Sequence, residues 1–296
     1  MIVVDPTGDR DLPGTLAALC AAARAPLHVF GAVDGFGAPD GPRYEPGLWP
    51  SGEQQAALAA VPWGPRPGPG SGTGGVTGLA DVLRQRGVAL FALGGPEAGS
   101  AAGVLTGLIA ADVAALYAGL YRAGIAPDGL CWLTACDGAD PVALAGLITA
   151  ASPTGLAPVL ASTAAEPAAR IAGQVNAAIV HRLADPALAT QLAPLTGTTI
   201  VPVSRVLGQP ERAGEDGGPL PVAYASHAAP LGTMEAPVVQ AGALCALSSN
   251  EFVLVTGLTA ARAGGAAVTV RARCQAVSER MPGPAPTALP AIRRPA

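Results

Sequence analysis

The sequence contains no lysine, and all 17 of its basic residues are arginine. A phosphate-binding loop of the G-x-x-x-x-G-K-[ST] type needs a lysine, so this class of nucleotide site is excluded. Alanine, glycine and proline are abundant, and aromatic residues make up only 4% of the chain. Arginine without lysine in such a composition indicates a GC-rich bacterial genome rather than a specialised surface.

Positive charge is also scarce. The formal net charge is −4 and the pI is about 5.4. The one local basic cluster is Arg293-Arg294. A nucleic-acid-binding surface needs a basic face that displaces counterions, so nucleic acid is not an expected partner.

Cysteine and histidine do not form metal-binding patterns. The five cysteines contain no Cys-x-x-Cys pair, and their odd number does not indicate a disulfide scaffold. The three histidines are widely separated: His28, His181 and His227. We therefore predict no metal site and no cofactor.

Neither apolar segment that resembles a targeting or membrane element fits that role. The run Ile2 to Val4 is too short for the core of a signal peptide and is interrupted by Asp5, which favours a cytoplasmic location. The stretch 101–120 is long enough to cross a membrane, but Asp112 lies near its centre. A buried helix of a soluble α/β domain is the better interpretation, with no membrane span.

Strand-like and helix-like segments alternate over most of the chain, which is typical of an α/β fold with a mainly parallel sheet. We expect five parts: a first βαβ unit at 1–33, a Pro/Gly-rich insertion at 34–78, the α/β core at 79–205, a strand-rich part of the same domain at 206–280, and a disordered tail at 281–296. A short helix is possible at 53–60 within the insertion, and a longer helix is expected at 166–183. The predicted architecture is a three-layer sandwich.

The insertion contains one formal nucleotide-binding motif. The run from Gly70 to Gly75 matches G-x-G-x-x-G, but the preceding Pro-Arg-Pro-Gly-Pro cannot form the strand that this motif requires. A flexible linker explains it better. Trp49 and Trp63 either anchor the insertion to the body or form a contact patch, and anchoring is favoured because aromatic side chains bury large areas.

The stretch from Gly87 to Thr163 organises the rest. It reads as strand, helix, strand, helix, strand, with small or polar residues after each strand. The carboxyl ends of parallel strands are where open sheets bind ligands. Cys136 follows the second of these strands and precedes a helix, where a thiol would be exposed near backbone N–H groups that favour thiolate. The alternative is that Cys136 is one more small buried residue.

The order of elements, together with Leu133-Thr-Ala-Cys136, resembles the caspase-like cysteine peptidases, a group that includes caspases, gingipains, the self-cutting domains of large bacterial toxins, and CHAT domains. In that group one strand ends in His-Gly, and the next core strand ends in the nucleophilic cysteine some forty to fifty residues later. The resemblance implies that Cys136 is the nucleophile and that Gly94 or Gly95 stands where the family has its histidine. Gly94, Gly95 and Gly138 are then turn or oxyanion-binding candidates.

Replacement of that histidine by glycine predicts a degenerate site, because a cysteine nucleophile needs a base or a cationic partner. Of the three histidines, only His227 is retained as a distant candidate base. Aspartates that follow strands could form an acidic edge for Mg²⁺ or acid–base chemistry, although ordinary loop and cap roles are the simpler explanation. These residues are Asp5, Asp34, Asp137 and Asp140.

Three functions are therefore open. The first is a non-catalytic protein of caspase-like fold that acts in protein interaction or assembly, with a protein as its partner. The second is a cysteine peptidase with Cys136 as nucleophile. The third is a small-molecule enzyme on a generic doubly wound sheet, using the acidic edge.

Overall fold

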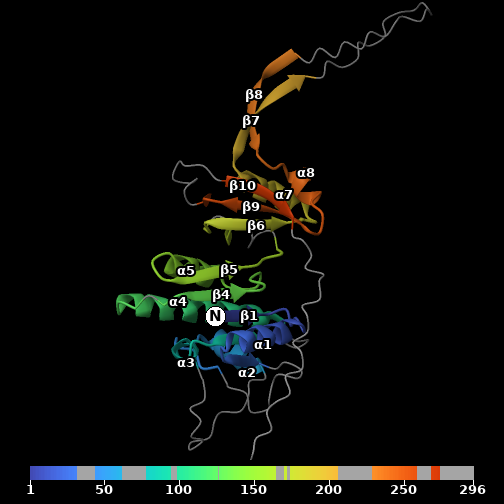
Figure 1. Ribbon diagram of the computed structural model, residues 1–296. Helices are drawn as coiled ribbons and strands as arrows, with labels where there is room; N and C mark the ends of the chain where they lie inside the picture. The colour runs from blue at the N-terminus through green and yellow to red at the C-terminus, as the bar shows by residue number, and fades with distance from the viewer. Residues whose placement is uncertain are drawn as a thin grey trace, which may run out of the picture. The chain divides into compact units, whose positions relative to one another are not determined.

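The computed structural model describes residues 1–31, 44–61, 78–94, 99–125, 127–164, 170–171, 174–205, 229–258 and 268–273. The chain divides into two compact units (Figure 1). Unit 1 comprises Met1–Asn176 with Leu258–Ala263, and unit 2 comprises Ala177–Gly257 with Gly264–Ala296. The division falls between 176 and 177, and again between 257 and 258 and between 263 and 264.

Unit 1 is built on a parallel sheet of five strands in the order β2-β3-β1-β4-β5. The strands are β1 (Ile2–Asp5), β2 (Leu27–Gly31), β3 (Val88–Ala92), β4 (Gly129–Leu133) and β5 (Leu156–Leu160). All four neighbouring pairs are parallel. Every residue of β1 is buried, as expected for the central strand of a sheet covered on both faces. The predicted α/β class and mainly parallel sheet are confirmed.

Helices cover this sheet on two sides. Helix α1 (Leu12–Ala23) places Leu12 and Leu16 against Val3 and Leu90 on one face. The other helices are α2 (Gly52–Ala60), α3 (Leu79–Arg84), α4 (Gly99–Arg122) and α5 (Pro141–Ala151). They join the larger core on the opposite face, where α4 and α5 lie side by side (Figure 1). The result is the predicted three-layer arrangement.

Helix α4 is the long apolar segment that suggested a membrane span. By length and composition alone, residues Ser100–Arg122 could cross a membrane, but more than half of the most apolar window is buried inside the protein. Asp112, near its middle, accepts hydrogen bonds from the Tyr44 hydroxyl and from the Gly47 N–H. The buried carboxylate therefore ties residues 44–47 of the insertion to the core.

Within the insertion, the predicted short helix is confirmed as α2. Its first turn is closed by a capping box, in which Ser51 and Gln54 exchange side-chain and backbone hydrogen bonds. Trp49 is 92% exposed, so it does not anchor the insertion as expected. Trp63 and the Gly70–Gly75 motif lie outside the described residues.

Unit 2 contains antiparallel sheets. Three strands pair in the order β10-β9-β6: β6 (Ala177–His181), β9 (Glu251–Thr256) and β10 (Val268–Arg273). Strands β7 (Thr198–Arg205) and β8 (Ala229–Pro237) form a separate two-stranded sheet. The short helices are α7 (Pro186–Leu192), the 3₁₀ turn Ala193–Thr196, and α8 (Ala241–Cys245).

The helix predicted at 166–183 is wrong over its second half, which forms β6 instead. Ile171, Val175, Ile179 and Leu183 are spaced by four, but this spacing does not decide the structure. Ile179 and Val180 are β-branched, and they pair with Leu254 and Val253 of β9. Tertiary pairing thus overrides the helical pattern. Strand β8 and helix α8 were not predicted.

Close packing of α4 against the loop after β4 yields a stability prediction. A Cβ added at Gly103 would lie 2.3 Å from the carbonyl oxygen of Gly138, whereas nothing lies within 4 Å of one added at Gly119 of the same helix. Gly103→Ala should lower the free energy of unfolding by about 1–3 kcal/mol because backbone must move. Gly119→Ala should raise it by about 0.5–1 kcal/mol. Urea unfolding of both variants measures this, and equal effects would contradict the packing.

Candidate functional site

The carboxyl ends of β1, β4 and β5 carry the polar residues that the sequence singled out. The chain leaves β1 toward α1 on one face, and it leaves the neighbouring β3 and β4 toward α4 and α5 on the other. The connections that follow β1 and its neighbours thus run to opposite faces of the sheet. Open parallel sheets usually form a binding crevice where this change of direction occurs. The end of β1 is therefore the place to look for a site.

Asp5 ends β1 with a buried carboxylate that accepts four hydrogen bonds. Its Oδ1 accepts from the Thr7 N–H at 3.0 Å, the Thr7 hydroxyl at 2.6 Å and the Thr134 hydroxyl at 2.9 Å. Its Oδ2 accepts from the Asp9 N–H at 2.9 Å. A buried carboxylate must be compensated in this way. The bonds hold the loop after β1 in place and tie it to β4, so Asp5 has a structural role.

The crevice between β1 and β3 is filled by backbone. A Cβ added at Gly94 would lie 2.0 Å from the Gly8 nitrogen, so the two loops touch there. Gly8 has a φ of +73°, which favours glycine. No side chain other than glycine fits at Gly94 without moving the loop after β1. Gly94 therefore closes the crevice rather than opening it.

Asp137 joins β4 to the segment after β5. Its carboxylate accepts from the hydroxyls of Ser162 and Thr163 and from the N–H groups of Thr163 and Ala164. Burial alone would raise the pKa of Asp137, but these hydrogen bonds outweigh it and lower the pKa. Asp140 serves a different purpose, because its carboxylate accepts from the Val142 N–H at 2.9 Å and caps α5.

Cys136 is fully buried, so of the two alternatives left open by the sequence the buried one is correct. Its backbone N–H and its thiol both donate to the carbonyl oxygen of Ala161, each at 2.9 Å. Burial first, and the negative charge of Asp137 second, raise the pKa of Cys136 to about 11. The thiol is therefore protonated and engaged at neutral pH. Gly138, which follows it, packs against Gly103 of α4.

Of the histidines in the described residues, His28 is the one that belongs to the same unit as this thiol. His28 lies in β2, paired with Ala89 near the amino end of β3, so it is at the opposite end of the sheet from Cys136. Burial lowers the pKa of His28. His181 belongs to unit 2. Asp34, Gly95 and His227 lie outside the described residues.

The order of strands in the sheet also separates Gly94 from Cys136, the two positions that the resemblance to caspase-like peptidases would place in one active site. Gly94 follows β3 and Cys136 follows β4, but β1 lies between these strands. Two strand spacings place the ends of β3 and β4 roughly 10 Å apart. A side chain at Gly94 would meet the loop after β1 before it could reach the thiol.

Sequence reasoning missed the hydroxyl donors of this edge, Thr7, Thr134 and Ser162. For Thr7 the sequence does contain an indication. The run Asp5-Pro-Thr-Gly8 has the composition of a turn in which an aspartate accepts from the backbone two residues later. Nothing local indicates that Thr134, 129 residues away, donates to the same oxygen.

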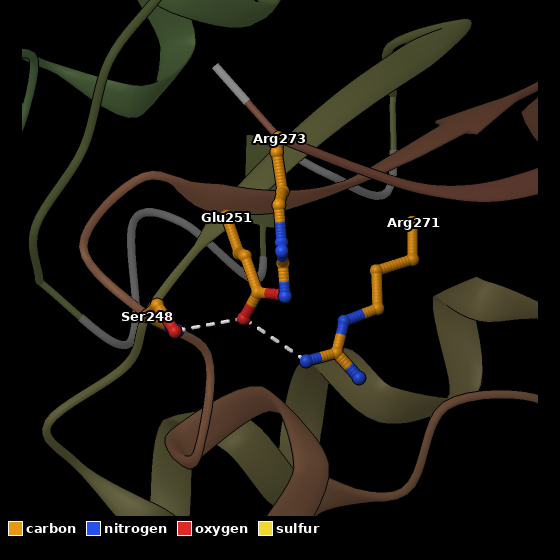
Figure 2. Close-up of polar contacts among 4 residues, drawn as sticks. All are labelled: Ser248, Glu251, Arg271 and Arg273. Atoms are coloured by element: carbon orange, nitrogen blue, oxygen red, sulfur yellow. Dashed lines mark hydrogen bonds and ion pairs between the residues drawn. The ribbon is translucent and has the colours of Figure 1, made fainter. Parts of the chain in front are cut away.

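A second polar cluster lies in unit 2, at the start of β9 (Figure 2). Glu251 accepts from the Ser248 N–H at 2.9 Å, from Arg271 at 3.0 Å and from Arg273 at 2.9 Å. These bonds, led by the one from Ser248, lower the pKa of Glu251 from its ordinary value of 4.5 to about 2. An open depression of about 420 Å³ is lined by Glu251, Arg271, Ala272 and Arg273. The sequence analysis did not identify this cluster.

In the part of the chain that the structure describes, no group of three or more His, Cys, Asp or Glu side chains could hold a metal ion. Asp5, Asp137 and Asp140 at the sheet edge each accept hydrogen bonds from different donors and do not converge on one metal position. In comparisons with known proteins, no family, curated protein or solved structure matches this chain.

The hydrogen bonds of Asp137 give a testable pH dependence. Because its pKa is lowered in the folded protein, its contribution is present above about pH 4 and is lost as the pH falls further. Asp137→Asn should lower the free energy of unfolding at pH 7 by about 1–2 kcal/mol, since the carboxylate is partly exposed. The difference from the wild type should shrink at about pH 3.

Asp11→Asn is the matched control. Asp11 is exposed and its side chain makes no cap hydrogen bond, so the change should stay within about 0.5 kcal/mol at both pH values. Urea unfolding curves at the two pH values provide the measurement. A loss for Asp137→Asn that is the same at both would show that its charge is not what matters.

Proposed function

We propose that this chain is a non-catalytic α/β protein that acts in protein interaction or assembly. The observation that carries the proposal is the state of Cys136, the only candidate nucleophile of the sheet edge. Its thiol is buried, bonded to the Ala161 carbonyl and held protonated by its surroundings. A cysteine nucleophile needs the opposite: an accessible thiol with a lowered pKa and a nearby base.

The acidic edge supports the same proposal. The carboxylates of Asp5 and Asp137 each accept several hydrogen bonds from neighbouring loops, and Asp140 caps a helix. A carboxylate that takes part in catalysis or metal binding needs free acceptor positions facing a cavity. The bonds observed instead fasten β1, β4 and β5 to one another. A relation to caspase-like peptidases remains a prediction, and the proposal does not depend on it.

Apolar surface on unit 2 supports a role in binding proteins. The register of β6, β9 and β10 places Ile179, Leu254 and Val270 in one row across the sheet. Ile179 is 60% exposed, Val270 is 49% exposed and the neighbouring Val268 is 58% exposed. A solvated face of an antiparallel sheet is normally polar, and exposed apolar patches commonly mark interaction sites.

Alkylation of the full chain with iodoacetamide at pH 7, read by peptide mass spectrometry, tests the proposal. With a pKa of about 11, roughly one Cys136 thiol in ten thousand is ionised at pH 7. Among the cysteines that the structure describes, partly exposed Cys245 should react first, and Cys136 should react only when denaturant is added. Peptide hydrolysis should be absent.

Cys136→Ala and Cys245→Ala provide the matched pair. Hydrolysis of a peptide mixture by the wild type and by Cys245→Ala, but not by Cys136→Ala, would contradict the proposal. Selective labelling of Cys136 in the native protein would do so as well.

A further inference from the structure

We propose that the free edge of β10 binds an extended segment of a partner protein in which acidic and apolar side chains alternate. The inference rests on the proposed role in protein interaction and names the surface and the chemistry of the partner. It starts from strand order. In the described part of the chain, β10 pairs with β9 on one side and with no strand on the other. Every second N–H and C=O group of β10 therefore points away from the sheet, where an added strand can pair with it.

The two faces of β10 differ in chemistry. Val268, Val270 and Ala272 alternate with Thr269, Arg271 and Arg273. The first three continue the apolar outer face formed with Ile179 and Leu254. On the other side Thr269 donates to the Thr196 carbonyl oxygen, and the two arginines follow it along the strand. A strand added beside β10 would thus meet apolar side chains on one face and cations on the other.

Glu251 holds the two arginines in position. Figure 2 shows both guanidinium groups turned toward its carboxylate. Arg271 Nη2 lies 3.0 Å from Oε2, and Arg273 Nε lies 2.9 Å from Oε1. Two cations on one carboxylate leave a net positive charge. The side chains of Arg271 and Arg273 remain 55% and 73% exposed. Each guanidinium has five N–H donors, so most donors remain available beside the open depression.

Carboxylates are the groups that match these donors. Ordered arginines bind carboxylates through parallel N–H···O bonds, and their order here is already provided by Glu251. Exposed ion pairs add little affinity, so backbone pairing and the apolar row must contribute most of it. The charges instead select between partners: an acidic strand is attracted, and a basic strand is repelled. The other free edge, β6, carries no arginine within the strand.

The test uses the full chain and short fluorescein-labelled peptides with blocked ends. One peptide alternates valine and glutamate, and a second alternates valine and lysine. Fluorescence anisotropy should show binding of the glutamate peptide and at least about tenfold weaker binding of the lysine peptide. Raising the salt from about 0.05 M to about 0.5 M should reduce this difference.

Backbone pairing is tested on the peptide, so that the protein is not perturbed. Two forms of the glutamate peptide carry N-methyl groups on alternate residues, one form for each phase. In one form the N-methyl groups replace the N–H hydrogens that would face β10, and this peptide should not bind. In the other form they replace the hydrogens that point away from β10, and this peptide should bind as before. Equal binding of both forms would overturn the proposal, because a peptide lying on the surface without pairing would not distinguish them.

Arg273→Gln tests the cation and should weaken the glutamate peptide about three- to tenfold. Arg182→Gln, just beyond the end of β6, is the control for loss of one positive charge and should leave binding unchanged. If Arg273→Gln lowers the melting temperature, Arg271→Gln is used in its place. If both are unstable, the peptide comparisons on the wild type decide.

Absence of binding up to about 1 mM, equal affinity for the glutamate and lysine peptides, or full competition by citrate would each overturn the proposal. The last result would mean a simple anion site. None of these outcomes bears on Cys136. Failure of this inference is therefore distinguishable from failure of the proposed function, which would appear as hydrolysis that depends on Cys136.

Discussion

The buried carboxylate of Asp5 is the interaction on which the organisation of unit 1 depends. It lies at the carboxyl end of the central strand, and it accepts from the loop that follows β1 and from Thr134 after β4. Placing a carboxylate there without these donors would cost several kcal/mol. The carboxylate therefore determines how the loops on either side of β1 must fold. Backbone reinforces it: Leu93 N–H donates to the Asp5 carbonyl oxygen, and Thr134 N–H to that of Val4.

The same principle continues across the edge. Asp137 fastens the end of β4 to Ser162 and Thr163, and the Ala161 carbonyl receives both donors of Cys136. The carboxylates of Asp5 and Asp137 accept their hydrogen bonds from neighbouring loops. In open parallel sheets this edge commonly holds a ligand, and here its carboxylates bind the loops that follow the strands. Strands β6 and β10 of unit 2 carry exposed apolar side chains, and β10 also carries two exposed arginines.

Much of unit 1 follows from the sequence, because strands buried on both faces read as continuous apolar runs and the helices between them are long. The strands at 88–92, 129–133 and 156–160 are the three strands that the sequence predicts within the stretch 87–163. The order of the strands cannot be predicted from the sequence, because no local sequence pattern places β1 between β3 and β4. The burial of Cys136 depends on that order, and so does the bond between Asp5 and Thr134.

Unit 2 was less predictable for a related reason. The segment at 177–181 has the apolar spacing of a helix, and β9, the strand with which it pairs, lies more than seventy residues later in the sequence. The cluster of Glu251, Arg271 and Arg273 likewise forms only through the antiparallel register of β9 and β10. The alternation of Val268, Val270 and Ala272 with polar residues is visible in the sequence and is typical of a strand with one apolar face.

The most direct test of this account is a double-mutant cycle between Asp5 and Thr134, measured by chemical unfolding. Asp5→Ala and Thr134→Val should couple by about 1–2 kcal/mol, because each removes one side of the same buried, charge-assisted hydrogen bond. The same cycle with Thr149→Val, whose hydroxyl bonds within α5, should be additive. Additivity within about 0.3–0.5 kcal/mol for Asp5 and Thr134 as well would contradict the claim that this carboxylate organises the edge.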